Sequence, residues 1–385
     1  MSIHPEAQLY SMNNKNNNAI PILSFYSGGG FLDMGFEMGG FEIVWTNEID
    51  SNFAKLHAAG ITSWRKSKGD LKKAEIINTK SITEISSKEI IHEAFSDIVP
   101  NYFGIIGGPP CQDFTLHGKM EGFNGARGKL TIEFFDKILE LGPTFFVMEN
   151  VTGLTKNKDS KKHLLMLLER INEKYKVDFK ILNALDFGVP QHRERIFFIG
   201  IKREVIEHDK AKVNLEGNWF NWPQNRAYSG SENKYEWPKA IPYGKRLKKP
   251  KHLPIKLCVQ NCLVSNRDER KIPNADEYFN LYVEEEKLKN INEGETNRPS
   301  FKRLHRFKFS PTACYGNNEV HLHPYRQRRL SVRETLRIQG VPDTYVLPKD
   351  MPLTSKFKMI GNGVPVPLAY EVSKCVMKFL KDITF

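Results

Sequence analysis

Cysteine is scarce in this chain: its 385 residues include only five cysteines, an odd number at scattered positions. Such cysteines do not form a disulfide framework, so we expect free thiols and a reducing cytoplasm. Long apolar runs are also missing, because no window approaches the ~20 apolar residues of a membrane span. Residues 1–19 show neither a secretory signal nor an apolar period, so we expect a flexible tail there.

Apolar residues make up 40% of the chain, enough for sizeable cores, which excludes a disordered or fibrous protein. The length suggests about two domains of ~150 residues each. Lysine and arginine number 57 against 45 aspartates and glutamates, a net charge of +12. This excess favours a polyanionic partner, although many proteins without one are equally basic.

Five short apolar runs predict β-strands, and helical patterns alternate with them. The strands are expected at residues 20–26, 41–45, 102–106, 145–148 and 195–199, and the helices at residues 31–38, 51–59, 331–339 and 367–380. The alternation predicts an α/β fold with a doubly wound, mostly parallel sheet. Composition changes after about Lys202, where proline, asparagine, tryptophan and lysine become common. We therefore expect a catalytic domain at residues 20–204, completed by 351–385, and a smaller irregular domain at 205–350.

A glycine turn follows the first predicted strand, and an acidic residue follows the second. Ligands of open α/β sheets bind at the carboxyl ends of the strands. Gly28, Gly29 and Gly30 would let the backbone approach a ligand closely. Glu48 could accept hydrogen bonds from ribose hydroxyls, and a helix-capping or surface role is an equal alternative. The G-x-G-x-x-G dinucleotide pattern is absent, which argues against a nicotinamide enzyme.

Cys111 follows two prolines in a loop after the third predicted strand. Pro109 and Pro110 stiffen this loop, so the sulfur would be held at the ligand edge. A lone cysteine is more often a buried structural residue, but such residues lie within strands or helices. A thiol in this loop could act as a nucleophile.

Charged residues near two other strands could complete a site around this thiol. Glu149 ends the fourth predicted strand, and Arg193 and Arg195 lie at the fifth. Each one alone could be a cap or a solvated charge. Together, a carboxyl group and two guanidinium groups could bind a planar heterocycle that carries ring N–H and C=O groups.

With these motifs in this order, the sequence resembles the C5-cytosine-specific DNA methyltransferases of the bacterial restriction–modification type. The resemblance extends from about Ile20 to Ala369. The matching segments are residues 25–36, 108–114, 126–130, 149–151, 191–195, 329–334, 339–343 and 361–365. Any one of them could occur by chance, but the ordered set is specific.

The resemblance implies methyl transfer from S-adenosyl-L-methionine to C5 of a flipped-out cytosine, through a covalent bond between Cys111 and C6. Glu149 would contact N3 and the exocyclic amine, and Arg195, with Arg193 beside it, would contact O2. Residues implied to bind the cofactor are Tyr26, Ser27, Gly28, Gly29, Gly30, Glu48, Ile49, Ser81, Ile82, Pro110, Leu130, Asn362, Gly363 and Val364.

Four positions depart from the family pattern. Tyr26 stands where phenylalanine is usual, Phe31 replaces the last glycine of the turn, and Gly363 replaces a more usual alanine or serine. The family's aspartate for the cofactor adenine has two candidate positions here. One is Asp70, and the other is Ser81, which we favour because its surroundings match better.

The irregular domain would be the target-recognition domain, and its basic runs would contact DNA phosphates. The candidate DNA contacts are Gln112, Lys245, Arg246, Lys248, Arg303 and Arg306. Solvated loops are the alternative for each basic run. Trp222 and Trp237, each followed by proline, are expected in a core or a turn rather than between bases.

Two other functions remain open at this point. An RNA-directed branch shares the motifs, so a tRNA cytosine could be the substrate, although the large basic domain favours duplex DNA. A catalytically silent DNA-binding protein is disfavoured, because it would need none of the four candidate catalytic residues. We expect a monomer without a metal, acting on duplex DNA in the bacterial cytoplasm, with a cognate restriction endonuclease acting separately.

Overall fold

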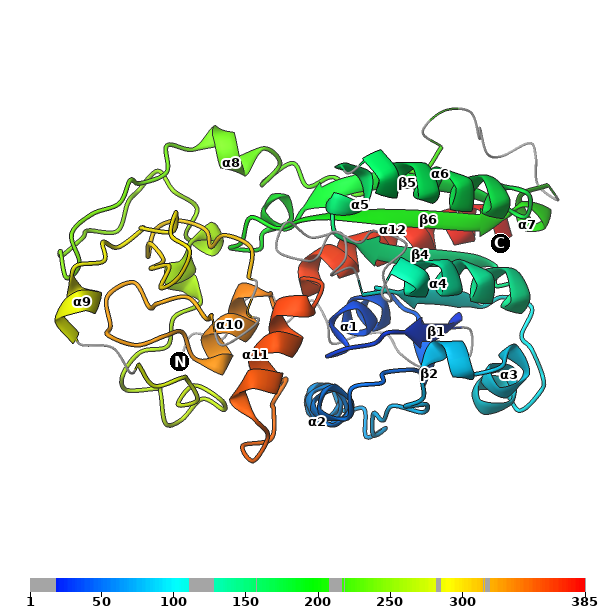
Figure 1. Ribbon diagram of the computed structural model, residues 1–385, viewed down its shortest axis with the longest axis horizontal. Helices are drawn as coiled ribbons and strands as arrows, with labels where there is room; N and C mark the ends of the chain where they lie inside the picture. Colours follow the sequence, from blue (N-terminus) through cyan, green and yellow to red (C-terminus); the bar gives the residue numbers. More distant parts are fainter. Residues whose placement is uncertain are drawn as a thin grey trace.

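The computed structural model describes residues 19–110, 128–156, 158–207, 217, 219–281, 285–313, 315 and 319–384. Within them, the core is a six-stranded sheet with the strand order β2-β1-β3-β4-β6-β5 (Figure 1). Its strands are β1 (Pro21–Phe25), β2 (Glu42–Thr46), β3 (Gly104–Gly107), β4 (Phe145–Asn150), β5 (Tyr175–Asn183) and β6 (Glu194–Lys202).

The first four strands pair in parallel, whereas β6 runs antiparallel to both β4 and β5. The predicted doubly wound, mostly parallel sheet is therefore confirmed. The sequence pattern did not indicate β5, because this strand lies at an edge of the sheet and is half-exposed. Its central residues Phe179, Lys180 and Ile181 are all exposed, so charged residues interrupt the apolar run.

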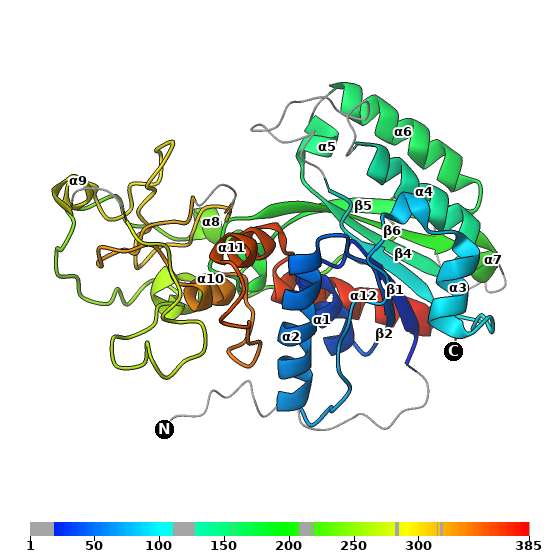
Figure 2. The same ribbon diagram turned by 60° about the horizontal axis from the view of Figure 1, so that its bottom comes forward.

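Helices cover both faces of the sheet, because successive strand residues point to opposite sides (Figure 2). On one face, Ile22 and Phe145 pack with α1 (Phe31–Met38) and α12 (Val366–Thr384). On the other face, Leu23 and Phe146 pack with α3 (Ser87–Phe95), α4 (Gly128–Leu141) and α6 (Lys158–Asn172). Shorter helices near the sheet are α5 (Gly153–Lys156) and α7 (Arg203–Glu207).

Three further helices lie between the sheet and the irregular region (Figure 1). They are α2 (Ser51–Ser67), α10 (Val332–Ile338) and α11 (Leu353–Asn362). Asp50 caps α2 by accepting hydrogen bonds from the backbone N–H groups of Asn52 and Phe53. Ser331 and Glu334 form a reciprocal capping box that starts α10. These caps fix where two of the helices begin.

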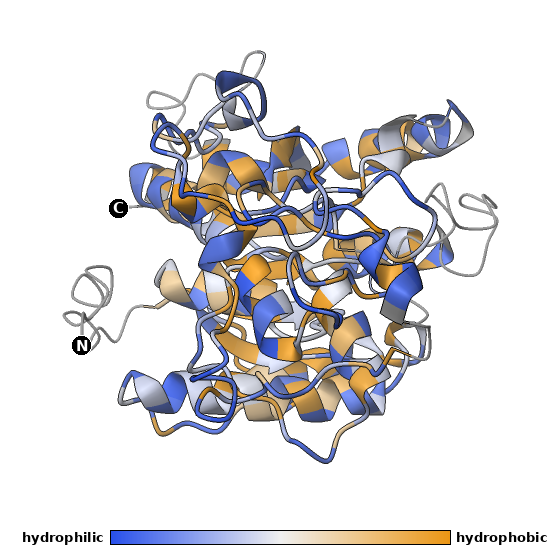
Figure 3. Ribbon diagram, turned by 90° about the vertical axis from the view of Figure 1, so that its left-hand side faces the viewer, coloured by the Kyte–Doolittle hydropathy of each residue, from blue (hydrophilic) through white to orange (hydrophobic). Residues whose placement is uncertain are grey.

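The stretch of chain from the end of β6 to the start of α10, which is the irregular region, is mostly loops. It contains the short helices α8 (Ser231–Lys234) and α9 (Glu285–Lys289). Figure 3 views the molecule from this side and shows hydrophilic residues on many of the outer loops. Trp222 is buried in the core of the sheet, which confirms the expectation for this residue. Trp237 donates a hydrogen bond to the carbonyl of Ser231 and packs its ring against Phe309.

In the part of the chain that the structure describes, no helix is both long enough and apolar enough to cross a bilayer. The described cysteines Cys258, Cys262 and Cys375 are free thiols. The limits expected for the two domains, at residues 205 and 351, stay predictions. Trp219 and Phe220, which follow the first limit, pack against Phe379 of α12 beside the sheet.

Candidate active site at the carboxyl edge of the sheet

The ends of three parallel strands lie side by side at one edge of the sheet. Phe25 of β1 pairs with Gly107 of β3, which pairs with Met148 of β4. The residues that follow them, including Glu149, are therefore neighbours in space. Because β6 is antiparallel, its first residues, including Arg195, start at this same edge. Strand direction thus brings polar clusters that are distant in sequence to one place.

Glu149 and Arg195 form a buried ion pair at this edge. Glu149 of β4 lies opposite Phe197 of β6. Arg195 is two residues before Phe197, so its side chain is on the same face of the sheet as that of Glu149. The Nε atom of Arg195 is 2.9 Å from Oε1 of Glu149, and their side chains are 12% and 9% exposed. Burial raises the pKa of Glu149, while the charges of Arg195 and Arg193 partly oppose this shift. A raised pKa favours a protonated carboxyl group, which can donate a hydrogen bond.

The loop that leads to Cys111 approaches this pair closely. A β-carbon on Gly108 would lie 3.1 Å from Oε2 of Glu149, so the glycine leaves room for the carboxylate. Asn150 donates a hydrogen bond of 3.5 Å to the carbonyl of Pro109, which fastens the loop to β4. Pro110 is exposed and is the last described residue before a gap. Cys111 and Gln112 lie outside the described residues.

Arg193 occupies a different place from the one expected. Its side chain is fully buried, and its guanidinium group donates hydrogen bonds to the carbonyls of Ala313, at 3.2 Å, and Gly361, at 2.9 Å. These backbone partners hold the side chain inside the protein. The expectation that Arg193 contacts the cytosine beside Arg195 is corrected accordingly, and Arg193 becomes a supporting residue.

The glycine turn, residues 28–30, is joined directly to Glu48. Gly28 and Gly30 have φ angles of +53° and +73°, which side chains rarely adopt. The N–H of Gly28 donates to Oε2 of Glu48 at 2.9 Å, and the N–H of Asp50 donates to Oε1 at 2.8 Å. Since Asp50 caps α2, Glu48 is not the helix cap. Each carboxylate oxygen keeps a second lone pair, so Glu48 can still accept hydroxyl groups of a ribose.

The residue after Glu48 supplies an apolar surface. Ile49 is 64% exposed, unusually open for an isoleucine next to a buried carboxylate. The N–H of Glu48 donates to the carbonyl of Asn78, and the side chain of Asn47 donates to the carbonyl of Lys80. The residue before Ser81 is therefore beside the end of β2.

This placement supports Ser81 rather than Asp70 as the residue near the cofactor base. Asp70 is exposed after the end of α2, where its carboxylate accepts the N–H of Lys72. Ser81 precedes a short helical turn, and its hydroxyl bonds to that of Thr83 at 2.8 Å. Ile82 is only 2% exposed and packs in the core, so it could reach a ligand only through its backbone.

Tyr26 connects the glycine turn to the start of α4. Its hydroxyl donates to the carbonyl of Leu130 at 3.0 Å, and burial raises its pKa. Ser27 is buried and donates to the carbonyl of Ser24 at 3.0 Å, so its hydroxyl points into the protein. Both residues brace the turn through their side chains.

The end of α11, which leads into the late turn at residues 362–364, lies against the glycine turn. A β-carbon on Gly29 would lie 3.0 Å from Sδ of Met359, in the last part of α11. Asn362 is exposed, and Val364 is buried in the sheet's core. The structure therefore brings together the two segments expected to bind the cofactor. A carboxylate, an exposed isoleucine and two close backbone turns suit an adenosine bearing an amino acid group.

Sequence patterns missed some buried polar residues that support this site. The hydroxyl of Tyr345 donates to the carbonyl of Gly29 at 2.8 Å, although Tyr345 belongs to an irregular segment without a periodic signal. Asp33 is buried beneath the turn and accepts a 2.6 Å hydrogen bond from Ser24. His57 lies 4.0 Å from Asp33. A charged residue on the buried face of α1 was the available signal for Asp33.

The expected DNA contacts divide into exposed and buried residues. Lys245, Arg246 and Lys248 are exposed. Arg306 pairs with buried Glu293, with its Nε donating to Oε1 at 2.8 Å.

Arg303 is fully buried, which contradicts its expected contact with DNA. Its guanidinium group donates to four backbone carbonyls, those of Leu288, Ile291, His323 and Arg326. The contact is withdrawn for Arg303, because burial and these partners keep its guanidinium group from the phosphates.

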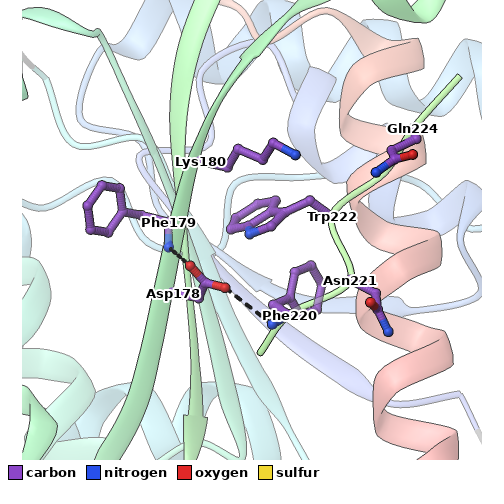
Figure 4. Close-up of a pocket in the computed structure, with 7 residues that line it drawn as sticks. All are labelled: Asp178, Phe179, Lys180, Phe220, Asn221, Trp222 and Gln224. Carbon is purple, nitrogen blue, oxygen red and sulfur yellow. Dashed lines mark hydrogen bonds between the residues drawn. The ribbon is translucent and has the colours of Figure 1, made fainter. Parts of the chain in front are cut away.

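A cavity of about 310 Å³ lies elsewhere, beside the edge strand β5 (Figure 4). Asp178 fastens the adjoining segment by accepting hydrogen bonds from the backbone N–H groups of Phe179 and Phe220. The lining contains none of the candidate site residues. The polar residues at the carboxyl edge of β1, β2 and β4 therefore remain the candidate site.

Known proteins resemble this chain over almost its whole length. The sequence pattern of the family C-5 cytosine-specific DNA methylase matches residues 20–378. Type II methyltransferase M.NmeDI of Neisseria meningitidis serogroup C is 36% identical over 371 residues, 94% of this chain and 84% of that protein. Type II methyltransferase M.FnuDI of Fusobacterium nucleatum is 31% identical over 373 residues, 94% of this chain and 95% of that protein.

Solved structures show the same fold. The structure of a DNA modification methyltransferase encoded within an E. coli prophage has a TM-score of 0.63 and 22% identity, and the match covers 94% of this chain and all of that one. That of Spodoptera frugiperda DNMT2 has a TM-score of 0.58 and 17% identity, over 93% of this chain and all of that one. With its sheet, its glycine turn and its matched sequence, this chain belongs to the C-5 cytosine-specific DNA methylases, enzymes that transfer a methyl group from S-adenosyl-L-methionine to cytosine C5 in DNA.

Proposed function

We propose that this chain methylates one cytosine within a specific duplex DNA sequence, with Cys111 as the nucleophile that attacks C6. The observation that carries the proposal is the buried pair of Glu149 and Arg195. This pair lies beside the loop whose last described residue, Pro110, immediately precedes Cys111. A thiol, a carboxyl group with a raised pKa and a guanidinium group are the groups that a cytosine ring requires.

The roles follow from the electron flow in the ring. The thiolate of Cys111 forms a bond to C6, the C5–C6 double bond opens, and negative charge spreads toward N3 and O2. Protonated Glu149 donates at N3, and the guanidinium group of Arg195 donates at O2, so the charge is stabilised. The bound cofactor supplies an electrophilic methyl group for C5. Loss of the C5 proton then restores the double bond and releases the Cys111 thiolate.

The residues around the two turns would hold the cofactor. Glu48 would accept the ribose hydroxyls, and Ile49 would pack on the adenine. The glycine turn would lie near the amino acid group, because its backbone can approach a ligand closely. The other contacts that we propose for the cofactor are Tyr26, Ser27, Ser81, Ile82, Pro110, Leu130, Asn362, Gly363 and Val364.

The irregular region would bind DNA and offset the cost of base flipping. A stacked cytosine shields C5 and C6, and its extrusion costs a few kcal/mol. Exposed Lys245, Arg246 and Lys248 would contact phosphates, and these favourable contacts would help to offset this cost. Gln112, next to the nucleophile, would contact the DNA near the flipped base.

A role in restriction–modification is supported by the names of the relatives, which are Type II methyltransferases. The chain would act as a monomer on cytoplasmic DNA, and a separate endonuclease would cut the same sequence when it is unmethylated. Light scattering of the protein with its DNA would measure its mass and so test whether it acts as a monomer. Resistance of methylated plasmid to that endonuclease would test whether the two enzymes recognise the same sequence.

The central experiment measures labelled methyl transfer from S-adenosylmethionine to unmethylated duplex DNA and, separately, to bulk tRNA. We expect label on DNA alone and none with Cys111→Ser. A duplex with 5-fluorocytosine at the site should stay covalently bound to the wild-type protein, because fluorine cannot leave as a proton does. Label on tRNA alone would overturn the DNA assignment, and label on DNA with Cys111→Ser would overturn the nucleophile.

A further inference from the structure

Three buried side chains join the late turn to the start of β6. Gln191, Arg193 and Gln339 are each 0% exposed. They come from segments far apart in sequence, before β6 and after α10. Polar groups buried to this degree need hydrogen-bond partners, so their contacts show what they hold.

The two glutamines are hydrogen-bonded to each other. Nε2 of Gln191 donates to Oε1 of Gln339 at 3.1 Å. Nε2 of Gln339 donates to the carbonyl of Ile360 at 2.7 Å, and the carbonyl of Gly363 lies 3.5 Å from it. Gln339 therefore binds the last turn of α11 and the late turn that follows.

The other side of the network closes through Ala313, which lies within the irregular region. The N–H of Ala313 donates to Oε1 of Gln191 at 2.9 Å, and its carbonyl accepts from Arg193. Arg193 also donates to the carbonyl of Gly361. A β-carbon on Gly361 would lie 2.9 Å from the backbone nitrogen of Tyr315, so the two backbones touch. The contacts form a closed ring that starts and ends at α11.

We propose that Gln339 and Gln191 are positioning residues that hold the late turn at a fixed distance from the base-binding end of β6. Arg193 completes this ring two residues before Arg195, so the same contacts locate the cofactor side and the cytosine side of the site. The inference rests on the proposed cofactor role of residues 362–364. It assigns a function to Gln339.

The test is Gln339→Met, which keeps the length of the side chain and removes its hydrogen bonds. Loss of these bonds leaves the carbonyl of Ile360 and the amide of Gln191 without their partner, so we expect the Kd for S-adenosylmethionine, measured by calorimetry, to rise about tenfold. The KM for the cofactor should rise while the KM for DNA changes little. The variant Gln191→Met cuts the ring elsewhere and should weaken cofactor binding in the same direction.

A matched control is Tyr175→Phe. Tyr175 is 0% exposed, and its hydroxyl donates to the carbonyl of Pro143 at 2.8 Å before the start of β4, so this change also removes a buried hydrogen bond but does not touch the ring. It should lower the thermal midpoint and leave the Kd for the cofactor unchanged. Equal weakening in the control and the glutamine variants, or wild-type affinity in folded Gln339→Met and Gln191→Met, would overturn the inference. A wild-type protein that does not bind S-adenosylmethionine would instead overturn the proposed cofactor site itself.

Discussion

Phe31 and Gly363 are complementary in shape: a β-carbon on residue 363 would overlap the aromatic ring of Phe31. Gly363 has φ −65° and ψ 150°, a conformation open to any residue, so it is space and not backbone freedom that requires glycine. Phe31 in turn packs edge-on against Tyr345, with ring centres 5.5 Å apart. Two departures from the family pattern thus compensate each other and set the spacing of the two turns.

Gly363→Ala should therefore weaken cofactor binding and lower the free energy of unfolding by about 1–3 kcal/mol, the usual cost of overpacking. Adding Phe31→Leu should restore part of both quantities, because the smaller side chain makes room for the methyl group. Calorimetric titration and thermal melting of Gly363→Ala, Phe31→Leu and the double variant give the coupling energy between the two positions. Strictly additive losses would show that the two positions do not compensate each other.

Replacing Cys111 with serine should abolish methyl transfer while leaving DNA binding intact, because an alcohol is a far weaker nucleophile than a thiolate. Cys375→Ser is the matched control, since Cys375 is a free thiol on α12, away from the site. Methyl transfer and a DNA shift assay should be measured for both variants. Full methyl transfer activity in Cys111→Ser would rule out Cys111 as the covalent nucleophile.

Methyl transfer should decline as pH rises through the raised pKa of Glu149, because the carboxyl group then loses its proton. Burial raises the pKa of Glu149, and the positive charge of Arg195 opposes this rise, so Arg195→Ala should move the decline to higher pH. The same variant should reduce kcat by roughly 100-fold or more, because it removes a donor at developing charge. A pH profile of single-turnover rates separates the two effects. A decline that moves to lower pH would contradict this electrostatic role of Arg195.

The triple variant Lys245→Ala, Arg246→Ala and Lys248→Ala should weaken DNA binding and reduce the slope of log K against log[salt] by roughly 3, one unit per lost phosphate contact. Its melting temperature should be unchanged, since all three residues are exposed.

Arg303→Ala should instead lower the stability of the protein and leave its DNA binding unchanged. Four carbonyls lose a buried donor, so unfolding should become easier by on the order of 3 kcal/mol, while the salt slope stays the same. An altered slope in Arg303→Ala would return this residue to the DNA interface.

The contribution of Asp33 to the stability of the folded protein should fall as pH rises from about 4 to about 7. Burial raises its folded-state pKa to about 7, with Ser24 and Arg65 opposing the rise and Glu37 adding to it. The folded state therefore binds the proton more tightly than the unfolded state does, and this advantage is lost above pH 7. Burial lowers the pKa of neighbouring His57 to about 4, so the contribution of His57 to stability changes in the opposite direction over this range, and a variant that alters Asp33 alone isolates the effect.

Asp33→Asn should match the wild-type free energy of unfolding near pH 4 and exceed it at pH 8. The amide oxygen can still accept the hydrogen bond from Ser24, and no charge is buried. Urea denaturation across this pH range gives the comparison. Equal stability of the two proteins at pH 8 would show that Asp33 carries no such cost.

Sequence patterns predicted the parallel part of the sheet well, because β1, β3 and β4 are buried on both faces and read as continuous apolar runs. They did not indicate β5, whose exposed centre mixes Phe179 and Ile181 with Lys180. The direction of β6 could not be inferred either, since an apolar run does not show which way a strand runs. That direction is what brings Arg195 to Glu149.

The candidate site shows the same division between local and tertiary information. The glycine turn and Glu48 could be located from residue type and spacing, and the structure joins them by a hydrogen bond. The different positions of Arg193 and Arg195 could not be predicted in this way, because both residues are arginines and they are only two residues apart. Only the position of Ala313 and Gly361 decides that the first is buried and the second faces the carboxylate.

The buried guanidinium group of Arg303 has a consequence for how recognition can diversify. Its four carbonyl partners come from two separate stretches, α9 with the residues just after it and residues 323–326, so one side chain holds these two stretches together. The basic loop that carries Lys245 and Lys248 supplies none of these four carbonyls, but it contacts the same interior. The ring of Tyr243 lies 4.2 Å from the guanidinium group of Arg303, and the carbonyl of Lys245 accepts a hydrogen bond from Arg306. A different outer loop that kept these two contacts could therefore change DNA specificity while the catalytic half stays as it is.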